Sequence, residues 1–238
     1  ASAVRPNHGE SVVELGPGAG TLTAALLRQG AEVIGVEADP AMRALLSTEF
    51  SDYALRVVEA DAAALDLSSP ELNLVEISAG KRIALCGNLP YAISGAIFRR
   101  LVAERTRIDR AVVMVQREVA LRLAASPGEK EYGALSVLRV KPGSFFPAPR
   151  VESAVVRLTP LAEERAPVDD ARFIAVVRAA FGMRRKTLRN ALKRVEGSAD
   201  ALESTGIDGG RRGETLSPEE FAALALALPV QDTEDAPA

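Results

Sequence analysis

The sequence predicts an α/β fold, in which a parallel sheet has helices on both faces and a small all-helical domain follows it. In the first two thirds of the chain, short apolar segments typical of buried strands alternate with segments whose apolar residues recur at helical spacing. The stretch between Pro160 and Pro167 resembles a linker, and the patterns after it are helical. We therefore expect two domains, over residues 1–162 and 163–238, the second ending in a disordered tail.

The expected strands are short and apolar, and two of them are followed directly by glycine. They cover residues 11–15, 32–37, 55–58, 83–86, 111–115, 135–140 and 151–158. The last two lack a long helix between them, so they can pair antiparallel at the edge of the sheet. Helices are expected over residues 20–28, from Pro40 with Asp39 as its cap, and over residues 94–102, 118–124, 170–181, 186–195 and 218–228.

Composition narrows the possible chemistry. The chain has 238 residues, 47% of them hydrophobic, and no apolar run approaches the roughly 20 residues of a membrane span, so no membrane association is expected. Cys86 is the single cysteine and His8 the single histidine, which argues against a metal site and against a Ser-His-Asp triad. A lone thiol fits a reducing, cytoplasmic location. The chemistry must then come from backbone, carboxylate, amide and aromatic groups.

A glycine-rich turn after the first expected strand is the first candidate binding site. Gly16, Gly18 and Gly20 allow the backbone to turn tightly and to approach a ligand closely. The dinucleotide-binding pattern requires a glycine where this chain has a threonine, so that pattern is not met. Glu37 ends the second strand, where it can accept hydrogen bonds from ribose hydroxyls, and Asp61 follows the third, within reach of an adenine amine. Parallel strands bring all these residues to one edge of the sheet, which predicts a nucleoside-containing cofactor there.

The segment Asn88-Leu89-Pro90-Tyr91 follows the fourth expected strand and reaches the same edge. An aromatic amine is a poor nucleophile, because its lone pair is drawn into the ring. The Asn88 side-chain oxygen and the Leu89 carbonyl can accept its two hydrogens, and Pro90 restricts Leu89 to an extended conformation. Tyr91 can stack on the base, and Phe145 can supply the opposite face. The motif predicts methyl transfer to an exposed adenine amine; the alternative is a proline turn with a core tyrosine.

Positive charge is concentrated in one part of the chain, although the net charge is −3. From Arg165 to Arg194 there are nine Lys or Arg residues against two Asp residues. In a helix, a spacing of four would place three of them on one stripe that can neutralise nucleic-acid phosphates. The alternative is an ordinary solvated helix face. The candidate RNA-binding residues are Arg184, Arg185, Lys186, Arg189 and Lys193.

In combination, these motifs resemble the KsgA family of small-subunit (16S) rRNA adenine dimethyltransferases. The resemblance runs from about Glu10 to Leu228. It rests on the segments VELGPGAG (13–20), GNLPY (87–91), QREV (116–119) and YGALSV (132–137), and on the patterns FxPxPRVxSAVV (145–156) and FxxRRKTLRN (181–190).

The resemblance implies a Rossmann-like class I methyltransferase sheet with a helical C-terminal domain. It implies transfer of four methyl groups from S-adenosyl-L-methionine to two adjacent adenosines near the 3′ end of 16S rRNA in the 30S subunit. By position, Gly16, Glu37, Asp61 and Asn88 match the family's cofactor contacts, and a monomer is expected. The family also has an N-terminal basic stretch that helps to close the cofactor pocket. The sequence begins just before the first strand without it, so we expect this difference to bear on cofactor affinity and activity.

Three other functions remain open. A sister enzyme that dimethylates a 23S rRNA adenine and confers macrolide resistance would share the fold and the motifs; residues 132–137 and 181–190 favour the small-subunit enzyme. A binding role, such as an assembly checkpoint, would not need an intact glycine turn and Asn88 motif. A small-molecule methyltransferase would not need the basic segment.

Overall fold

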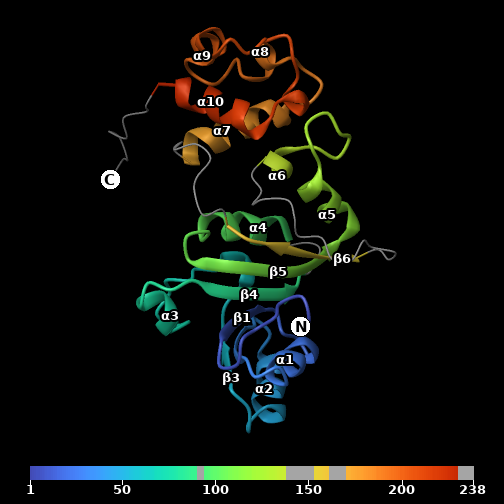
Figure 1. Ribbon diagram of the computed structural model, residues 1–238, viewed down its shortest axis with the longest axis vertical. Helices are drawn as coiled ribbons and strands as arrows, with labels where there is room; N and C mark the ends of the chain where they lie inside the picture. Colours follow the sequence, from blue (N-terminus) through green and yellow to red (C-terminus); the bar gives the residue numbers. More distant parts are fainter. Residues whose placement is uncertain (90–93, 138–152, 161–169, 230–238) are drawn as a thin grey trace. The chain divides into compact units, whose positions relative to one another are not determined.

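A six-stranded sheet is the central feature of the computed structural model, which describes residues 1–89, 94–137, 153–160 and 170–229 (Figure 1). The strand order is β3-β2-β1-β4-β5-β6, with β6 antiparallel to β5 and the other pairs parallel. This confirms the predicted α/β fold. The edge strand β6 is antiparallel, but its partner is β5 and not the strand expected over residues 135–140, so the expected pairing of the last two strands is wrong. The strands are β1 (Ser11–Leu15), β2 (Glu32–Val36), β3 (Leu55–Val58), β4 (Ile83–Asn88), β5 (Ile108–Gln116) and β6 (Ser153–Leu158).

The chain divides into two compact units. The first unit comprises Ala1–Ala120 with Val140–Leu161, and the second comprises Leu121–Arg139 with Ala162–Ala238. The predicted boundary after residue 162 is therefore wrong for residues 121–139. They belong with the C-terminal helices, because Tyr132 and Val137 are buried in the core of the second unit.

In the first unit, helices connect the strands as the sequence pattern predicts. The helix α2 is preceded by the predicted cap: the Asp39 Oδ1 atom accepts hydrogen bonds from the backbone N–H groups of Ala41 (2.8 Å) and Met42 (3.4 Å). Under α1, the side chains of Val12, Leu26 and Cys86 form part of a closed apolar core. The helical elements of this unit are α1 (Thr21–Leu27), α2 (Pro40–Glu49), the 3₁₀ turn η1 (Ala62–Ala64), α3 (Val75–Ser78) and α4 (Ser94–Ala103); α5 (Arg117–Ala124) crosses the unit boundary.

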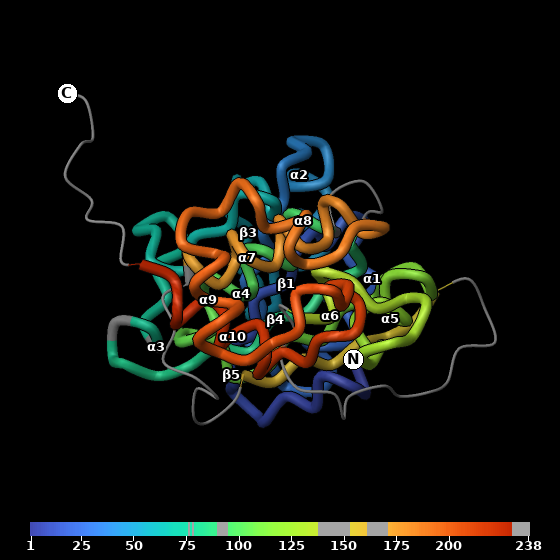
Figure 2. Tube along the Cα trace, turned by 90° about the horizontal axis from the view of Figure 1, so that it is seen from above, coloured from blue at the N-terminus to red at the C-terminus, as the bar shows by residue number. Residues whose placement is uncertain are grey.

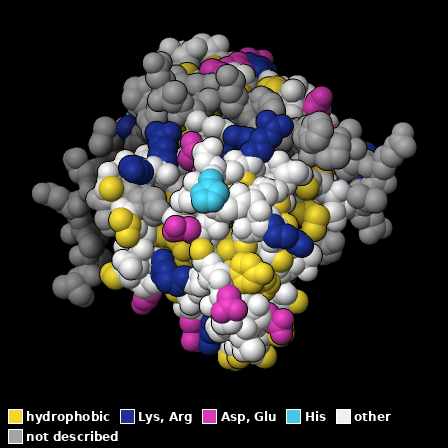
Figure 3. Space-filling view, turned by 60° about the horizontal axis from the view of Figure 1, so that its bottom comes forward, with side chains coloured by type: hydrophobic (Ala, Val, Ile, Leu, Met, Phe, Trp, Pro, Cys, Tyr) yellow, Lys and Arg dark blue, Asp and Glu magenta, His cyan; other side chains and the backbone are white. Residues whose placement is uncertain are grey.

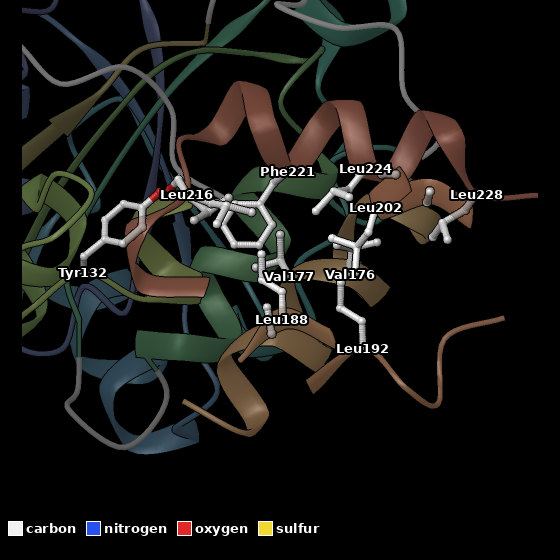
Figure 4. Packing of buried hydrophobic residues seen from close by; sticks show 14 of the residues in the cluster. Tyr132, Val176, Val177, Leu188, Leu192, Leu202, Leu216, Phe221, Leu224 and Leu228 are labelled. Carbon is white, nitrogen blue, oxygen red and sulfur yellow. Dashed lines mark hydrogen bonds between the residues drawn. The ribbon is translucent and has the colours of Figure 1, made fainter. Parts of the chain in front are cut away.

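In the second unit, α10 packs against α7 and α9, as the trace in Figure 2 shows. Figure 4 shows the core between them, where Phe221, Val177 and Leu188 are buried side by side. A capping box fixes the start of α10: the Ser217 hydroxyl accepts from Glu220 N–H, and the Glu220 carboxylate accepts from Ser217 N–H. The helical elements are α6 (Ala134–Val137), α7 (Asp170–Gly182), α8 (Leu188–Ala191), α9 (Ser198–Thr205), the 3₁₀ turn η2 (Gly213–Thr215) and α10 (Pro218–Ala227).

Two expected elements are wrong. Residues 134–137 form the helix α6 instead of the start of a strand, because the Ser136 hydroxyl donates to the Arg122 carbonyl and so bends the chain back. The expected helix over residues 186–195 is reduced to the single turn α8. The Ser198 hydroxyl donates a hydrogen bond to the Leu192 carbonyl at 2.9 Å, which occupies an acceptor that a longer helix would use. Gly197 then adopts a φ of 71°, and α9 begins at Ser198. The expected linker after Pro160, the proline loop around Phe145 and residues 138–140 lie outside the described residues.

We expect Tyr132→Phe to destabilise the second unit by about 1–2 kcal/mol. The Tyr132 ring is fully buried, and its hydroxyl donates to the Leu216 carbonyl at 2.8 Å (dashed line in Figure 4). Removal of the hydroxyl leaves this carbonyl without its donor. Urea unfolding measures the effect, and Tyr53→Phe is the matched control because the Tyr53 side chain is 57% exposed. Equal destabilisation by both variants would contradict the prediction.

Candidate cofactor and substrate site

The carboxyl ends of β1, β2, β3 and β4 meet at one edge of the sheet, because these strands are parallel neighbours. The glycine-rich turn follows β1, with φ values of 66°, 54° and 81° at Gly16, Gly18 and Gly20. These values lie in the left-handed region that glycine tolerates. A Cβ atom added at Gly16 or Gly18 would meet nothing within 4 Å. The turn therefore presents bare backbone to open space, as a ligand that approaches closely requires.

The Glu37 carboxylate fixes the shape of this turn. Its Oε2 atom accepts a hydrogen bond from Gly18 N–H at 3.0 Å, and its Oε1 atom accepts one from Asp39 N–H at 3.0 Å. A carboxylate oxygen has capacity for a second hydrogen bond. Glu37 can thus hold the turn and accept the two hydroxyls of a ribose at the same time. The residues present fit the nucleoside-containing cofactor that the sequence predicts.

Asp61 lies beyond the end of β3 and is exposed. Its Oδ1 atom accepts from Ala63 N–H at 2.8 Å, which caps η1 and fixes the side chain in place. The carboxylate remains accessible at the same edge as Glu37. This arrangement can accept a hydrogen bond from an exocyclic amine.

Asn88 is the last residue of β4 and is also exposed at this edge, opposite Met114 of β5 in the strand register. The next residue, Leu89, is buried, and its N–H donates to the Met114 carbonyl at 3.1 Å. Leu89 is thus anchored on one side of Asn88. The remaining candidate residues, Pro90, Tyr91 and Phe145, lie outside the described residues.

Sequence reasoning missed the role of Glu14, which lies directly before the glycine-rich turn. Its side chain is only 2% exposed, and its Oε2 atom accepts from the Thr23 hydroxyl of α1 at 2.7 Å. Burial raises the pKa of Glu14 to about 7, although the bond from Thr23 opposes the rise. Burial, with the neighbouring Glu14 charge, also raises the pKa of the Cys86 thiol. The available signal was a charged residue in an otherwise apolar strand.

The basic residues of the second unit do not form the expected helical stripe. Arg189 is in α8, whereas Arg185 lies in the turn before it and Lys193 in the turn after it. Arg184 forms an ion pair with Glu214 at 3.0 Å. Arg185, Lys186, Arg189 and Lys193 are exposed and form no ion pair with residues that the structure describes. In contrast, charges of both signs are intermingled on the face drawn in Figure 3.

Two further features can be read from the described part of the chain. No helix there is both long enough and apolar enough to cross a membrane. In the same residues, no three His, Cys, Asp or Glu side chains gather as metal ligands would.

The sheet order, the glycine turn after β1 and the acidic residue after β2 define the class I methyltransferase fold. The chain matches the Ribosomal RNA adenine dimethylase family over residues 1–228 and belongs to that family. This confirms the family that the motifs indicated.

Individual relatives agree with this family. "Ribosomal RNA small subunit methyltransferase A" of Myxococcus xanthus is 42% identical over 96% of this chain and 84% of its own length. The Geobacter sulfurreducens protein of the same name is 42% identical over 96% of this chain and 88% of its own. Among solved structures, a dimethyladenosine transferase from Plasmodium falciparum has a TM-score of 0.74 at 24% identity, covering 94% of this chain and 92% of that one. The 23S rRNA methyltransferase ErmE has a TM-score of 0.63 at 24% identity, covering 95% and 94%.

We expect Glu14→Gln to flatten part of the pH dependence of stability. The folded state raises the Glu14 pKa from its ordinary value of 4.5 to about 7, so it binds this proton more tightly than the unfolded chain does. The contribution to stability is full below about pH 4.5 and is lost as the pH rises through about 7. The loss is on the order of 3 kcal/mol at 1.36 kcal/mol per pKa unit.

Urea unfolding of the wild type and Glu14→Gln at pH 5 and pH 8 measures this effect. The stability difference between the two proteins should shift in favour of Glu14→Gln as the pH rises. Parallel profiles over this range would contradict the assignment.

Proposed function

We propose that this protein transfers methyl groups from S-adenosyl-L-methionine to the exocyclic amines of two adjacent adenosines near the 3′ end of 16S rRNA, within the 30S subunit. The observation that carries the proposal is the common sheet edge at which Gly18, Glu37, Asp61 and Asn88 lie, in a chain of the rRNA adenine dimethylase family. The 42% identity to proteins named for the small subunit favours this substrate over 23S rRNA. We further propose that it acts as a monomer in the cytoplasm.

Each cofactor contact has a physical reason. Bare backbone at Gly16 and Gly18 allows a close approach, Glu37 accepts the ribose hydroxyls while it holds the turn, and Asp61 accepts from the adenine amine. Asn88, at the end of β4, borders the cofactor on one side and the target base on the other. When bound, S-adenosyl-L-methionine supplies an electrophilic methyl group on a sulfonium.

The protein's task at the target is to position an amine and improve its nucleophilicity. The Asn88 side-chain oxygen and the Leu89 carbonyl accept the two amine hydrogens, which favours a more tetrahedral nitrogen and points its lone pair outward. Tyr91 and Phe145 stack on the base. No strong base is needed, because the proton can leave after the methyl group has been transferred, so most of the rate comes from positioning.

Methyl transfer from labelled cofactor tests the proposal on three substrates: undermethylated 30S subunits, 50S subunits and naked 16S rRNA. Label should enter adenosines near the 3′ end of 16S rRNA in the 30S subunit. Preferential labelling of 50S subunits would instead support the macrolide-resistance type of activity. Binding of 30S subunits without any label transfer would support a role in assembly.

Asn88→Ala should reduce single-turnover methylation by at least about tenfold, the effect of one lost hydrogen bond in the transition state. Because Asn88 is exposed at the end of its strand, the variant should melt like the wild type. Rapid-quench measurement with saturating 30S subunits gives the rate. Wild-type turnover in a normally folded variant would remove Asn88 from the catalytic site.

We also propose that Arg184, Arg185, Lys186, Arg189 and Lys193 contact rRNA phosphates. In place of a helical stripe, the support is a cluster of exposed charges in α8 and its flanking turns, most of them outside ion pairs with described residues. Each neutralised phosphate releases counterions, so each contact steepens the salt dependence of binding.

Replacement of Arg185, Arg189 and Lys193 by Gln should flatten the log–log salt dependence of 30S binding by about two to three units. Cofactor affinity should stay unchanged. The matched control replaces Arg28, Lys81 and Arg82, which are exposed near the amino ends of β2 and β4, at the opposite edge of the sheet. Filter binding over a salt series measures both slopes. Equal slopes for the two triple variants would show that the RNA docks elsewhere.

A further inference from the structure

Arg43, in α2, connects the chain segments that continue β2 and β3 beyond the sheet. Its Nη1 atom donates to the carbonyls of Ala38 (2.7 Å) and Glu37 (3.3 Å). Its Nη2 atom donates to the Glu59 carboxylate at 2.7 Å. The Arg43 side chain is 19% exposed and that of Glu59 is 74% exposed, so the guanidinium lies largely within the fold while its acidic partner faces solvent.

These two segments carry the residues that we assign to the adenosine half of the cofactor. The strand register of β2 and β3 ends at Val36 and Val58, and Glu37 N–H still donates to the Val58 carbonyl at 3.0 Å. Beyond that bond the β2 segment turns into α2, and the β3 segment continues through Glu59 to Asp61. Arg43 thus joins the two segments past the end of the β ladder.

Among the described residues, Arg43 forms no hydrogen bond or ion pair with either of the carboxylates that would receive the ligand. The Glu37 carboxylate is bound to Gly18 and Asp39 N–H groups, and the Asp61 carboxylate to Ala63 N–H. Arg43 instead bonds the backbone that carries Glu37 and the side chain two residues before Asp61. A guanidinium suits this task, because its donors are held in a rigid plane and can serve several acceptors at once.

We propose that Arg43 is a positioning residue that fixes the spacing between Glu37 and Asp61 and thereby the selectivity of the site for adenosine. The inference rests on the proposed function of these two acids. A ribose and an adenine amine lie at a fixed separation within one nucleoside. Two carboxylates can bind both groups only when their own separation is held, and a site built to accept an amine rejects an analogue that lacks it.

The test compares S-adenosyl-L-homocysteine with its inosine counterpart, in which a carbonyl replaces the adenine amine. Calorimetry gives the ratio of their dissociation constants. The wild type should prefer the adenine form by at least about tenfold. Arg43→Met keeps the aliphatic stem and removes the donors, and it should reduce this preference by about fivefold or more.

Arg56 provides a matched control. It also bonds several backbone carbonyls in the first unit, those of Glu71 (3.4 Å), Leu72 and Asn73 (3.3 Å), but not the segments that hold Glu37 and Asp61. Arg56→Met should therefore cost stability while it preserves the adenine preference. Wild-type preference in folded Arg43→Met, or an equal loss in Arg56→Met, would overturn the proposal.

Glu59→Ala decides the outcome if Arg43→Met fails to fold, because the exposed Glu59 side chain can be removed without opening the core. It should lower the adenine preference in the same direction, and an unchanged preference would overturn the role of Arg43. A wild-type protein that binds neither ligand would contradict the cofactor site itself, and one that binds both equally would contradict the contact of Asp61 with the adenine amine. If instead the wild type prefers the adenine form and Arg43→Met does not change this preference, only the role of Arg43 is overturned and the cofactor site stands.

Discussion

The parallel pairing of β1 with both β2 and β4 is the constraint on which the rest of the site depends. Because all three strands run in the same direction, whatever follows each of them emerges at one edge. The glycine turn, Glu37 and Asn88 are separated by tens of residues in the chain, and this pairing alone makes them neighbours in space. An antiparallel β2 or β4 would send its polar residue to the opposite edge.

A second property of the site is that much of it is organised by its own hydrogen bonds. The Glu37 carboxylate bonds the glycine turn, Asp61 caps η1, and the buried Glu14 bonds the Thr23 hydroxyl in the helix that follows the turn. Because these side chains are already held in place, they lose little conformational entropy when a ligand binds, and this favours affinity. The Glu14 bond to Thr23 joins β1 to α1 across the glycine-rich turn.

The sequence predicted the sheet well, because the signals for β1 to β5 are local. Short apolar runs mark each strand, Gly16 follows β1 directly, and Asp39-Pro40 marks the start of α2. The second unit was predicted less well, since long-range bonds decide its structure. Backbone N–H groups of Leu188 and Arg189 donate to the carbonyls of Arg211 and Gly209, and the local sequence around residue 188 does not predict these partners.

In the candidate site, the acidic residues were predictable because each follows a strand. The bond between Glu37 and Gly18, 19 residues apart, and the bridge made by Arg43 were not.

The discontinuous second unit has a consequence for biosynthesis and for modular exchange. Residues 121–139 leave the ribosome long before the C-terminal helices, yet Tyr132 bonds a carbonyl 84 residues later in the chain. This segment must therefore remain unassembled during translation, with its apolar side chains available to chaperones, until the last helices appear. For the same reason, a single recombination point after residue 161 would separate Tyr132 from its core. To transplant this helical unit between homologues, residues 121–139 and residues 162–238 must both come from the same donor protein.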